Sequence, residues 1–193
     1  SNLMRQGAHA EYAVVGANEI ASKPTSLDFV TAAAVPLAAL TAWQGLFDVG
    51  GLQAGQTVLI HGAGGGVGSF AVQFALAKGA RVIGTAGGDK QSLLNELGVT
   101  QAIDYTSTNF EEVVREVDVV FDTVGGELME RSLNVLKPGG ILVTPAGQPD
   151  AEAAKARGVR ATFMLAQANK AELEEITALI DKGRVKPVVS AMF

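Results

Sequence analysis

The stretch Thr57–Gly68, with the sequence TVLIHGAGGGVG, decides the fold class of this chain. It begins with a continuous apolar run at 57–61, which is typical of a strand buried on both faces of a parallel sheet. A glycine cluster follows, then a predicted helix at 69–78 and a second predicted strand at 81–85. A glycine cluster placed between a strand and a helix is the setting that a dinucleotide-binding loop requires.

The glycines do not form a strict G-x-G-x-x-G, but two registers nearly fit, and both share Gly65 and Gly68. Gly65 has no side chain, so a pyrophosphate could approach the backbone there, and Gly68 would let the helix pack closely on the strand. The start of the helix would add free N–H groups and a partial positive charge. A merely flexible turn is the alternative that the motif alone leaves open.

The alternation of strands and helices continues along the chain. Further strands are predicted at 101–104, 118–121, 141–144 and 159–164, with helices at 91–97, 110–115, 126–136, 151–156 and 169–182. Asp89 is expected to cap the helix at 91–97, and 137–140 to form a turn. Before the glycine cluster, we expect a strand at 10–15 and helices at 28–35 and 36–49. This order predicts an α/β fold with a doubly wound, parallel, six-stranded Rossmann sheet.

The end of the second strand bears on the choice of cofactor. An NAD site usually places an acid about 20 residues after the glycines, where it holds the ribose 2′-hydroxyl. Ala86 stands at that position, and a cation, Lys90, follows nearby. The backbone amides of Gly87 and Gly88 could add donors for a 2′-phosphate. The sequence therefore favours NADP(H) over NAD(H), unless Lys90 is only a solvated residue of the next helix and Asp89 only its cap.

Other strand ends supply further candidates, because ligands of this fold lie outside the carboxyl ends of the strands. Tyr105 could pack by the adenosine, Thr123 and Val124 could face the nicotinamide, and Gly147 could admit the cofactor backbone. Each is equally explained as an ordinary strand-end or turn residue. Neither a nucleophile elbow nor a Walker lysine is present, and His61 is expected to be structural, so the catalytic residues remain unknown.

Composition and charge exclude several other classes of protein. A net charge of −5 without a basic run argues against nucleic-acid binding. With no Cys and two His, neither a disulfide framework nor a thiolate zinc site is predicted, and we expect no metal. The uncharged run Phe29–Phe47 has nearly the length of a membrane span. Because Pro36 breaks it and no Lys or Arg flanks it, we expect two buried helices and no membrane partner.

Several motifs resemble the medium-chain dehydrogenases/reductases, and most closely their zinc-free quinone oxidoreductase branch, which is similar to zeta-crystallin. The motifs occur in that family's order over nearly the whole chain: 36–46 (PLAALTAWQGL), 61–68, 84–86, 104–105, 121–126 (FDTVGG) and 136–140 (LKPGG). The resemblance implies an NADPH-dependent reductase of quinones or activated alkenes that works by hydride transfer. The absence of Cys agrees with a zinc-free branch.

By position, the resemblance implies a pyrophosphate site at 64–68 and a 2′-phosphate site around Gly87, Lys90 and Tyr105. It places Val124 and the segment 144–147 near the nicotinamide ribose, and Thr41 near the nicotinamide. Gly88 departs from relatives that often carry a polar or basic residue there, which weakens the 2′-phosphate assignment. The predicted cofactor-binding residues are Thr41, Gly64, Gly65, Gly66, Val67, Gly68, Thr85, Gly87, Lys90, Tyr105, Val124, Ala146 and Gly147.

The resemblance also implies a domain that this sequence largely lacks. We expect residues 1–23 to be a remnant of a GroES-like substrate domain, 24–184 to be the NADP-binding Rossmann domain, and 185–193 to be a strand returning toward the substrate domain. A small quinone or enone substrate, a cytoplasmic location and a homodimer paired through Arg160–Met164 are further implications. Two alternatives stay open: an S-adenosylmethionine-dependent methyltransferase, suggested by 136–141, and a non-catalytic NADPH-binding module.

Overall fold

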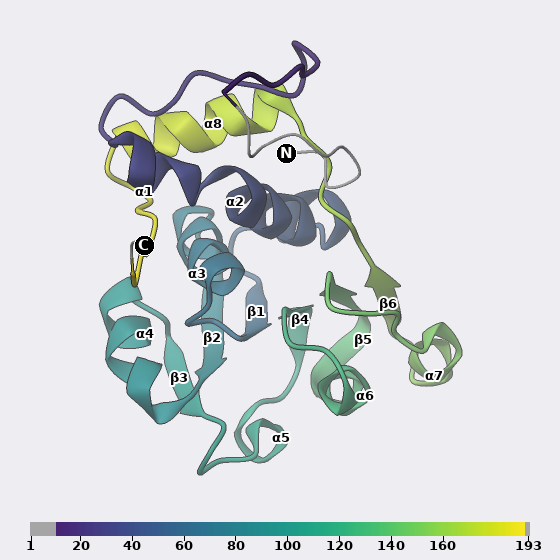
Figure 1. Ribbon diagram of the computed structural model, residues 1–193. Helices are drawn as coiled ribbons and strands as arrows, with labels where there is room; N and C mark the ends of the chain where they lie inside the picture. The colour runs from purple at the N-terminus through teal and green to yellow at the C-terminus, as the bar shows by residue number, and fades with distance from the viewer. Residues whose placement is uncertain (1–10, 192–193) are drawn as a thin grey trace.

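A computed structural model describes residues 11–191 as a single sheet covered by helices on both faces (Figure 1). The sheet has six strands in the order β3-β2-β1-β4-β5-β6, and every neighbouring pair is parallel. The strands are β1 Thr57–His61, β2 Arg81–Ala86, β3 Gln101–Asp104, β4 Val117–Asp122, β5 Leu136–Thr144 and β6 Arg160–Phe163. This confirms the predicted doubly wound sheet. The strand order reverses between β1 and β4, which opens a crevice at their carboxyl ends.

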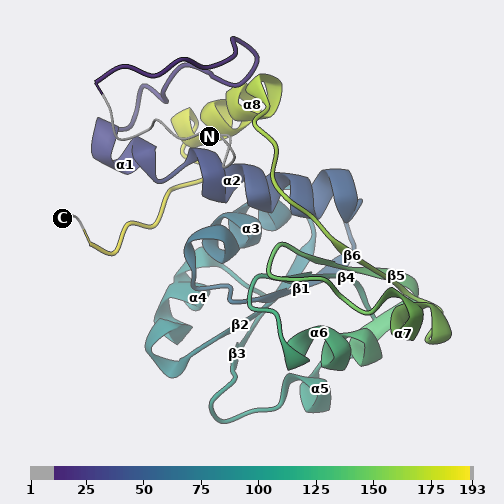
Figure 2. The same cartoon turned by 45° about the vertical axis from the view of Figure 1, so that its right-hand side comes forward.

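Helices form the two outer layers, as Figure 2 shows with α2, α3 and α8 on one side of the sheet and α5, α6 and α7 on the other. The helices are α1 Phe29–Ala33, α2 Pro36–Trp43, α3 Gly66–Ala77, α4 Gln91–Leu97, α5 Phe110–Val113, α6 Glu127–Ser132, α7 Ala151–Ala156 and α8 Lys170–Asp181. Short 3₁₀ turns, η2 Gly88–Lys90 and η3 Leu133–Val135, precede α4 and β5. No helix among residues 11–191 has the length and apolar character needed to cross a bilayer.

Each central strand contributes to two hydrophobic cores. In β1, Val58 and Ile60 pack into the core under α2, α3 and α8, whereas Leu59 packs into the core under α5 and α6. All three side chains are fully buried. Because successive residues of a strand point to opposite faces, a strand covered on both sides has to be apolar throughout. This explains why the sequence reads as a continuous run and not as an alternating one.

The helix predicted at 36–49 is wound differently in its second half. After α2, residues Gln44–Val49 form a π-helical segment, η1. Gly45 lies in this segment, where an added Cβ would stand 2.4 Å from the ring of Phe121 on β4. The buried Gln44 side chain donates to the carbonyl of Gln167 at 2.9 Å and accepts from its N–H at 2.9 Å. The segment thus follows tertiary packing against β4 and the β6–α8 connection.

Four local predictions are wrong. Residues 11–15 form no strand, and Tyr12 and Val14 are exposed, because no strand of the described chain lies beside them; Ala10 lies outside the described residues. The expected turn at 137–140 is an irregular part of β5, where the pairing with β4 shifts register. Helix α3 starts at Gly66 and not at 69. Asp89 does not cap α4, because η2 comes first and Lys90 takes the cap position.

The C-terminal run predicted as a return strand has no strand assignment over 185–191. It is held by the side chain of Gln73 on α3, whose Oε1 accepts from the N–H of Lys186 at 2.8 Å. The Nε2 of Gln73 donates to the carbonyl of the same residue at 2.9 Å. The proposed domain boundaries at 23 and 185 stay predictions.

Candidate functional site

The glycine-rich loop forms a cradle between β1 and α3. The start of α3 packs most closely on the end of β1 at Gly68, where an added Cβ would lie 2.1 Å from the carbonyl oxygen of Gly62. At Gly65 an added Cβ would meet only that same oxygen, at 3.2 Å, and at Gly66 it would meet nothing within 4 Å. Gly65 is the N-cap of α3, and no side chain of the described residues caps this helix. The backbone therefore leaves an open approach to the N–H groups at the helix start, as an anion requires.

A cavity of about 610 Å³ lies next to this cradle at the carboxyl ends of the strands. It brings together seven of the predicted residues: Gly64, Gly65, Thr85, Gly87, Lys90, Tyr105 and Val124. Its lining includes two apolar side chains, Phe110 of α5 and Leu128 of α6, and two charged ones, Asp89 and Lys90 of η2. The volume is that of a typical small-molecule site, and it lies at the reversal of strand order, where dinucleotides bind in this fold.

The remaining predicted residues lie outside this cavity. Gly66, Val67 and Gly68 form the first turn of α3. Thr41 is buried in α2, where its hydroxyl donates to the carbonyl of Leu37 at 2.8 Å. Ala146 and Gly147 follow β5, and an added Cβ at Gly125 would lie 3.1 Å from Ala146 Cβ, so the turns after β4 and β5 touch. Of the residues predicted near the nicotinamide, Val124 shares the cavity with the predicted adenosine residues, whereas Thr41, Ala146 and Gly147 lie outside it.

Charged groups gather where the cavity meets η2. The ammonium of Lys90 lies 3.9 Å from Oδ2 of Asp89, and both side chains are substantially exposed. The stem of Lys90 packs against the glycine-rich loop, because an added Cβ at Gly64 would stand 3.0 Å from Lys90 Cβ. Tyr105 stands across Gly87, with its hydroxyl 3.4 Å from an added Cβ there. The predicted 2′-phosphate residues are therefore neighbours in space, as the sequence predicts.

Buried polar side chains form a row across the sheet, and two of them, His61 and Thr85, line the cavity. The strand register places Thr85, His61 and Asp122 side by side on β2, β1 and β4. His61 Nδ1 lies 2.9 Å from the hydroxyl of Thr85, and Nε2 lies 3.0 Å from the hydroxyl of Ser132 on α6. The Ser132 hydroxyl donates to the carbonyl of Leu128 at 2.6 Å, so its oxygen accepts from His61 Nε2–H. His61 thereby ties β2 to α6.

Burial keeps this histidine neutral. It lowers the pKa of the His61 imidazole to about 4, against the opposing attraction of Asp122. The prediction that His61 is structural agrees with this network. Asp122, which is fully buried, accepts at Oδ1 from the N–H groups of Val124 at 2.9 Å and Gly125 at 3.1 Å. It shapes the turn after β4 that places Val124 on the cavity, whereas Oδ2 has no partner among residues 11–191.

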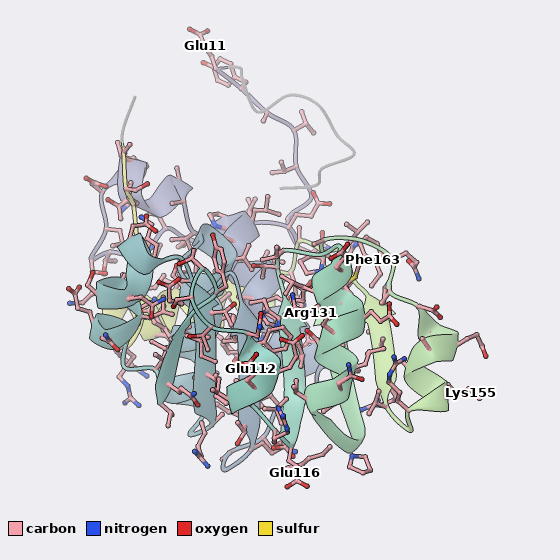
Figure 3. The ribbon with its side chains drawn as sticks, turned by 90° about the horizontal axis from the view of Figure 1, so that it is seen from below. Glu11, Glu112, Glu116, Arg131, Lys155 and Phe163 are labelled. Atoms are coloured by element: carbon pink, nitrogen blue, oxygen red, sulfur yellow. The ribbon has the colours of Figure 1, made fainter. Side chains whose placement is uncertain are left out.

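An ion pair joins α5 and α6, the two helices that contribute Phe110 and Leu128 to the cavity lining. Arg131 of α6 donates to Glu111 of α5 through Nη2 at 2.7 Å and also through Nε. This hydrogen bonding lowers the pKa of the Glu111 carboxyl. The guanidinium also lies 5.2 Å from the ring centre of Phe110. Figure 3 shows Arg131 directed toward α5, the helix that carries Glu112. The pair holds α5 and α6 together.

Several lining residues were not predicted from the sequence. Phe110 and Leu128 come from helices on the far side of the sheet, and nothing in their local sequence marks them. Asp89 also lines the cavity. Its sequence signal, an acid shortly after the second strand, is also the signal of a helix cap. Among residues 11–191, no three side chains of the metal-binding types are grouped to hold an ion.

Comparison with known proteins defines the class. A family model described as zinc-binding dehydrogenase matches residues 97–193. The chain therefore belongs to this family, and the predicted membership of the medium-chain dehydrogenases/reductases is confirmed. The family description mentions zinc, and the predicted independence of zinc stays a prediction.

Individual relatives are oxidoreductases. The chain is 36% identical to the mouse NAD(P)H oxidoreductase RTN4IP1, mitochondrial, over 98% of this chain and 56% of that protein. It is 37% identical to the 2-methylene-furan-3-one reductase of Solanum lycopersicum, over 95% of this chain and 45% of that protein. The Escherichia coli quinone oxidoreductase, solved with NADPH, matches with a TM-score of 0.79 and 30% identity over 88% of this chain and 59% of that one. The chain thus spans about half the length of the relatives it matches.

Proposed function

We propose that this chain is the cofactor-binding part of an NADPH-dependent oxidoreductase that reduces quinones or activated alkenes. The observation that carries the proposal is the open cradle at Gly65 and Gly66, which adjoins a cavity of about 610 Å³ that Lys90 also lines. The groups present suit a dinucleotide: helix N–H groups for the pyrophosphate, apolar side chains for the adenine, and an ammonium for the 2′-phosphate.

The cofactor, when bound, supplies the hydride, and this chain's residues bind and orient it. The first turn of α3 would hold the pyrophosphate, and the turns after β4 and β5, with Val124, Ala146 and Gly147, would direct the other half of the cofactor. Of these residues, Val124 lines the cavity, whereas Ala146 and Gly147 lie outside it. We therefore expect the 193-residue chain to bind NADPH and to turn over quinones slowly or not at all, as a binding module would.

Titration calorimetry tests the proposal with three ligands: NADPH, NADH and S-adenosylmethionine. Binding of NADPH, together with no detectable binding of S-adenosylmethionine, supports the dehydrogenase assignment. Binding of S-adenosylmethionine and of neither dinucleotide would instead support the methyltransferase alternative. The comparisons do not favour that alternative, and Ala86 argues against it, because a methyltransferase also needs an acid at this strand end. Lys90→Gln should weaken NADPH binding more than NADH binding, whereas an equal loss would remove Lys90 from the 2′-phosphate site.

We also propose a homodimer paired through β6. This strand, Arg160–Phe163, is an edge of the sheet, its last three residues are partly exposed, and Leu165 beyond it is 58% exposed. An unpaired strand edge is a template for a second strand. Light scattering of the chain and of Ala161→Pro tests the pairing. The N–H of Met164 donates to Thr144 beside β5, so the alternation along the strand directs the N–H of Ala161 to the free edge, where proline removes a donor. A cytoplasmic location is likewise proposed, and fractionation of cells that express the whole protein tests it.

A further inference from the structure

A second cavity lies at the opposite edge of the sheet from the glycine-rich cradle. It measures about 320 Å³ and is lined by residues at or just before the starts of β1, β4, β5 and β6, whereas the cradle lies where the strands end. None of its lining residues lines the cofactor cavity. Its volume is at the lower end of the range for small-molecule sites.

Two irregular backbone segments meet at this cavity. Residues 50–51, which line it, follow directly on the π-helical segment η1. The pairing of β5 with β4 passes from Leu136 to Ile141, so residues 137–140 form a bulged part of β5 opposite Asp118. Both π-helical turns and β-bulges are over-represented at functional sites. Their meeting at one cavity makes it a candidate binding site.

The acid in the lining is already paired. Asp118 accepts from Nζ of Lys137 at 2.9 Å through Oδ1 and at 3.0 Å through Oδ2. Its Oδ2 also accepts from the backbone N–H of Thr57 at 2.8 Å, and the side chain is only 17% exposed. Lys137 therefore balances the charge of Asp118, and both carboxylate oxygens have their donors.

The unpaired side-chain groups at this cavity are hydrogen-bond donors. Arg160 is the exposed first residue of β6, and its guanidinium has neither a hydrogen bond nor an ion pair within residues 11–191. Gln56 uses Oε1 to accept from the N–H of Gln53 at 2.8 Å, which leaves its NH₂ group to donate. A guanidinium presents a planar fork of N–H groups that matches the oxygens of a phosphate or a carboxylate. An anion is the ligand that these donors suit.

We propose that this cavity binds a small oxyanion, the phosphate or carboxylate group of a small molecule, through the guanidinium of Arg160 and the NH₂ group of Gln56. Lys137, held by Asp118, adds positive charge to the wall. The site goes beyond the proposed function and does not depend on it, because it shares no residue with the cofactor cavity. Pairing through β6 would use the backbone of that strand, whereas this site uses a side chain.

Nuclear magnetic resonance titration of the isotope-labelled chain tests the proposal, with inorganic phosphate and citrate as separate ligands. Sodium chloride at matched ionic strength controls for screening of charges. We expect saturable shifts of the amide signals of Gly51, Gly139 and Gly140, and the ligand that saturates them at lower concentration identifies the preferred head group. No saturable shift there, or shifts confined to Gly65 and Gly66 in the dinucleotide cradle, would overturn the proposal.

Arg160→Gln should weaken phosphate or citrate binding at least about tenfold, because hydrogen bonds to charged groups are the strong ones. Arg160→Lys keeps the charge without the fork, so its affinity should fall between those of the wild type and Arg160→Gln. Arg157→Gln is the matched control. It removes the same charge just before β6, from a guanidinium that lies outside the cavity and already donates to Asn134 and Glu130.

The control variant should change the affinity by less than about twofold, as expected for an exposed charge outside the site. Equal losses in the two glutamine variants, or the same shifts with sodium chloride, would overturn the oxyanion site. A chain that binds phosphate or citrate here but neither dinucleotide would overturn the proposed function alone, so the two failures are distinguishable.

Discussion

Gly65 and Gly68 lie in the same glycine-rich segment, but replacing each with alanine should affect different properties. We expect Gly68→Ala to lower stability and Gly65→Ala to weaken NADPH binding. At Gly68 the new Cβ would stand 2.1 Å from the Gly62 carbonyl oxygen and 2.7 Å from Ala63 Cα, so the first turn of α3 would have to move away from β1. Overpacking of this kind costs about 1–3 kcal/mol in free energy of unfolding. For a domain of this size, that cost lowers the melting temperature by roughly 2–4 °C per kcal/mol.

At Gly65 the methyl group would meet only the Gly62 oxygen, at 3.2 Å, and Gly65 has φ of −84° and ψ of 176°, which alanine adopts without strain. We expect Gly65→Ala to lose at most about 1 kcal/mol, the usual cost of alanine at an N-cap. The methyl group would instead stand on the cavity side, where the pyrophosphate must reach the backbone. Because a hydrogen bond to a charged group contributes about 1.5–3 kcal/mol, NADPH should bind at least about tenfold more weakly.

Urea denaturation and NADPH calorimetry on the same samples separate the two effects. Gly65→Ala should lose affinity and at most about 1 kcal/mol of stability, whereas Gly68→Ala should lose about 1–3 kcal/mol of stability. Gly66→Ala serves as the stability control, because its Cβ would meet nothing within 4 Å. A Gly68→Ala variant as stable as the wild type would refute the packing argument, and a Gly65→Ala variant with unchanged affinity would refute the placement of the pyrophosphate.

The neutral His61 should make the free energy of unfolding depend on pH. The pKa of its imidazole falls from 6.5 in the unfolded chain to about 4 in the folded one, so the unfolded chain takes up a proton first as the pH falls. The free energy of unfolding should therefore drop by up to about 3 kcal/mol between those two pH values. Urea titrations at several pH values should show this part of the slope vanish in His61→Gln, and equal slopes would contradict the assignment. Ser132→Ala leaves the Nε2–H of His61 without its acceptor and should cost about 1–3 kcal/mol, whereas Ser132→Thr retains the hydroxyl and serves as the comparison. Gly45→Ala should destabilise by about 1–3 kcal/mol, because its Cβ would lie 2.4 Å from the Phe121 ring. The double variant with Phe121→Leu should recover part of that loss, and strict additivity of the two costs would show that the contact is not the cause.

Much of the fold was predictable because it depends on local pattern. Apolar runs bounded by glycines and polar turns marked all six strands of the sheet. The continuous apolar run at Thr57–His61 predicted a strand covered on both faces. The exceptions were elements whose form depends on distant partners. The strand predicted at 10–15 finds no neighbouring strand in the described chain, and η1 takes its winding from the packing of Gly45 on Phe121.

The same division holds for the candidate site. The glycines, Lys90 and Tyr105 were identifiable because each follows a predicted strand end. The role of Asp89 was hidden, because a helix cap and a cavity carboxylate have the same sequence signature. Only the 3₁₀ turn η2 decides between them. Likewise, His61 was visible as a strand-end residue, but its hydrogen bonds to Thr85 and Ser132 join three elements far apart in sequence.

The sequence by itself therefore determined the class of fold and the edge of the sheet at which a ligand would lie. It could do so because strand periodicity, glycine conformation and parallel topology are local or follow from element order. The tertiary structure alone decided which side chains meet there, including the facing charges of Asp89 and Lys90 and the apolar wall of Phe110 and Leu128. Such contacts depend on how helices from both faces of the sheet pack at the strand ends, and the spacing of residues along the chain does not encode that packing.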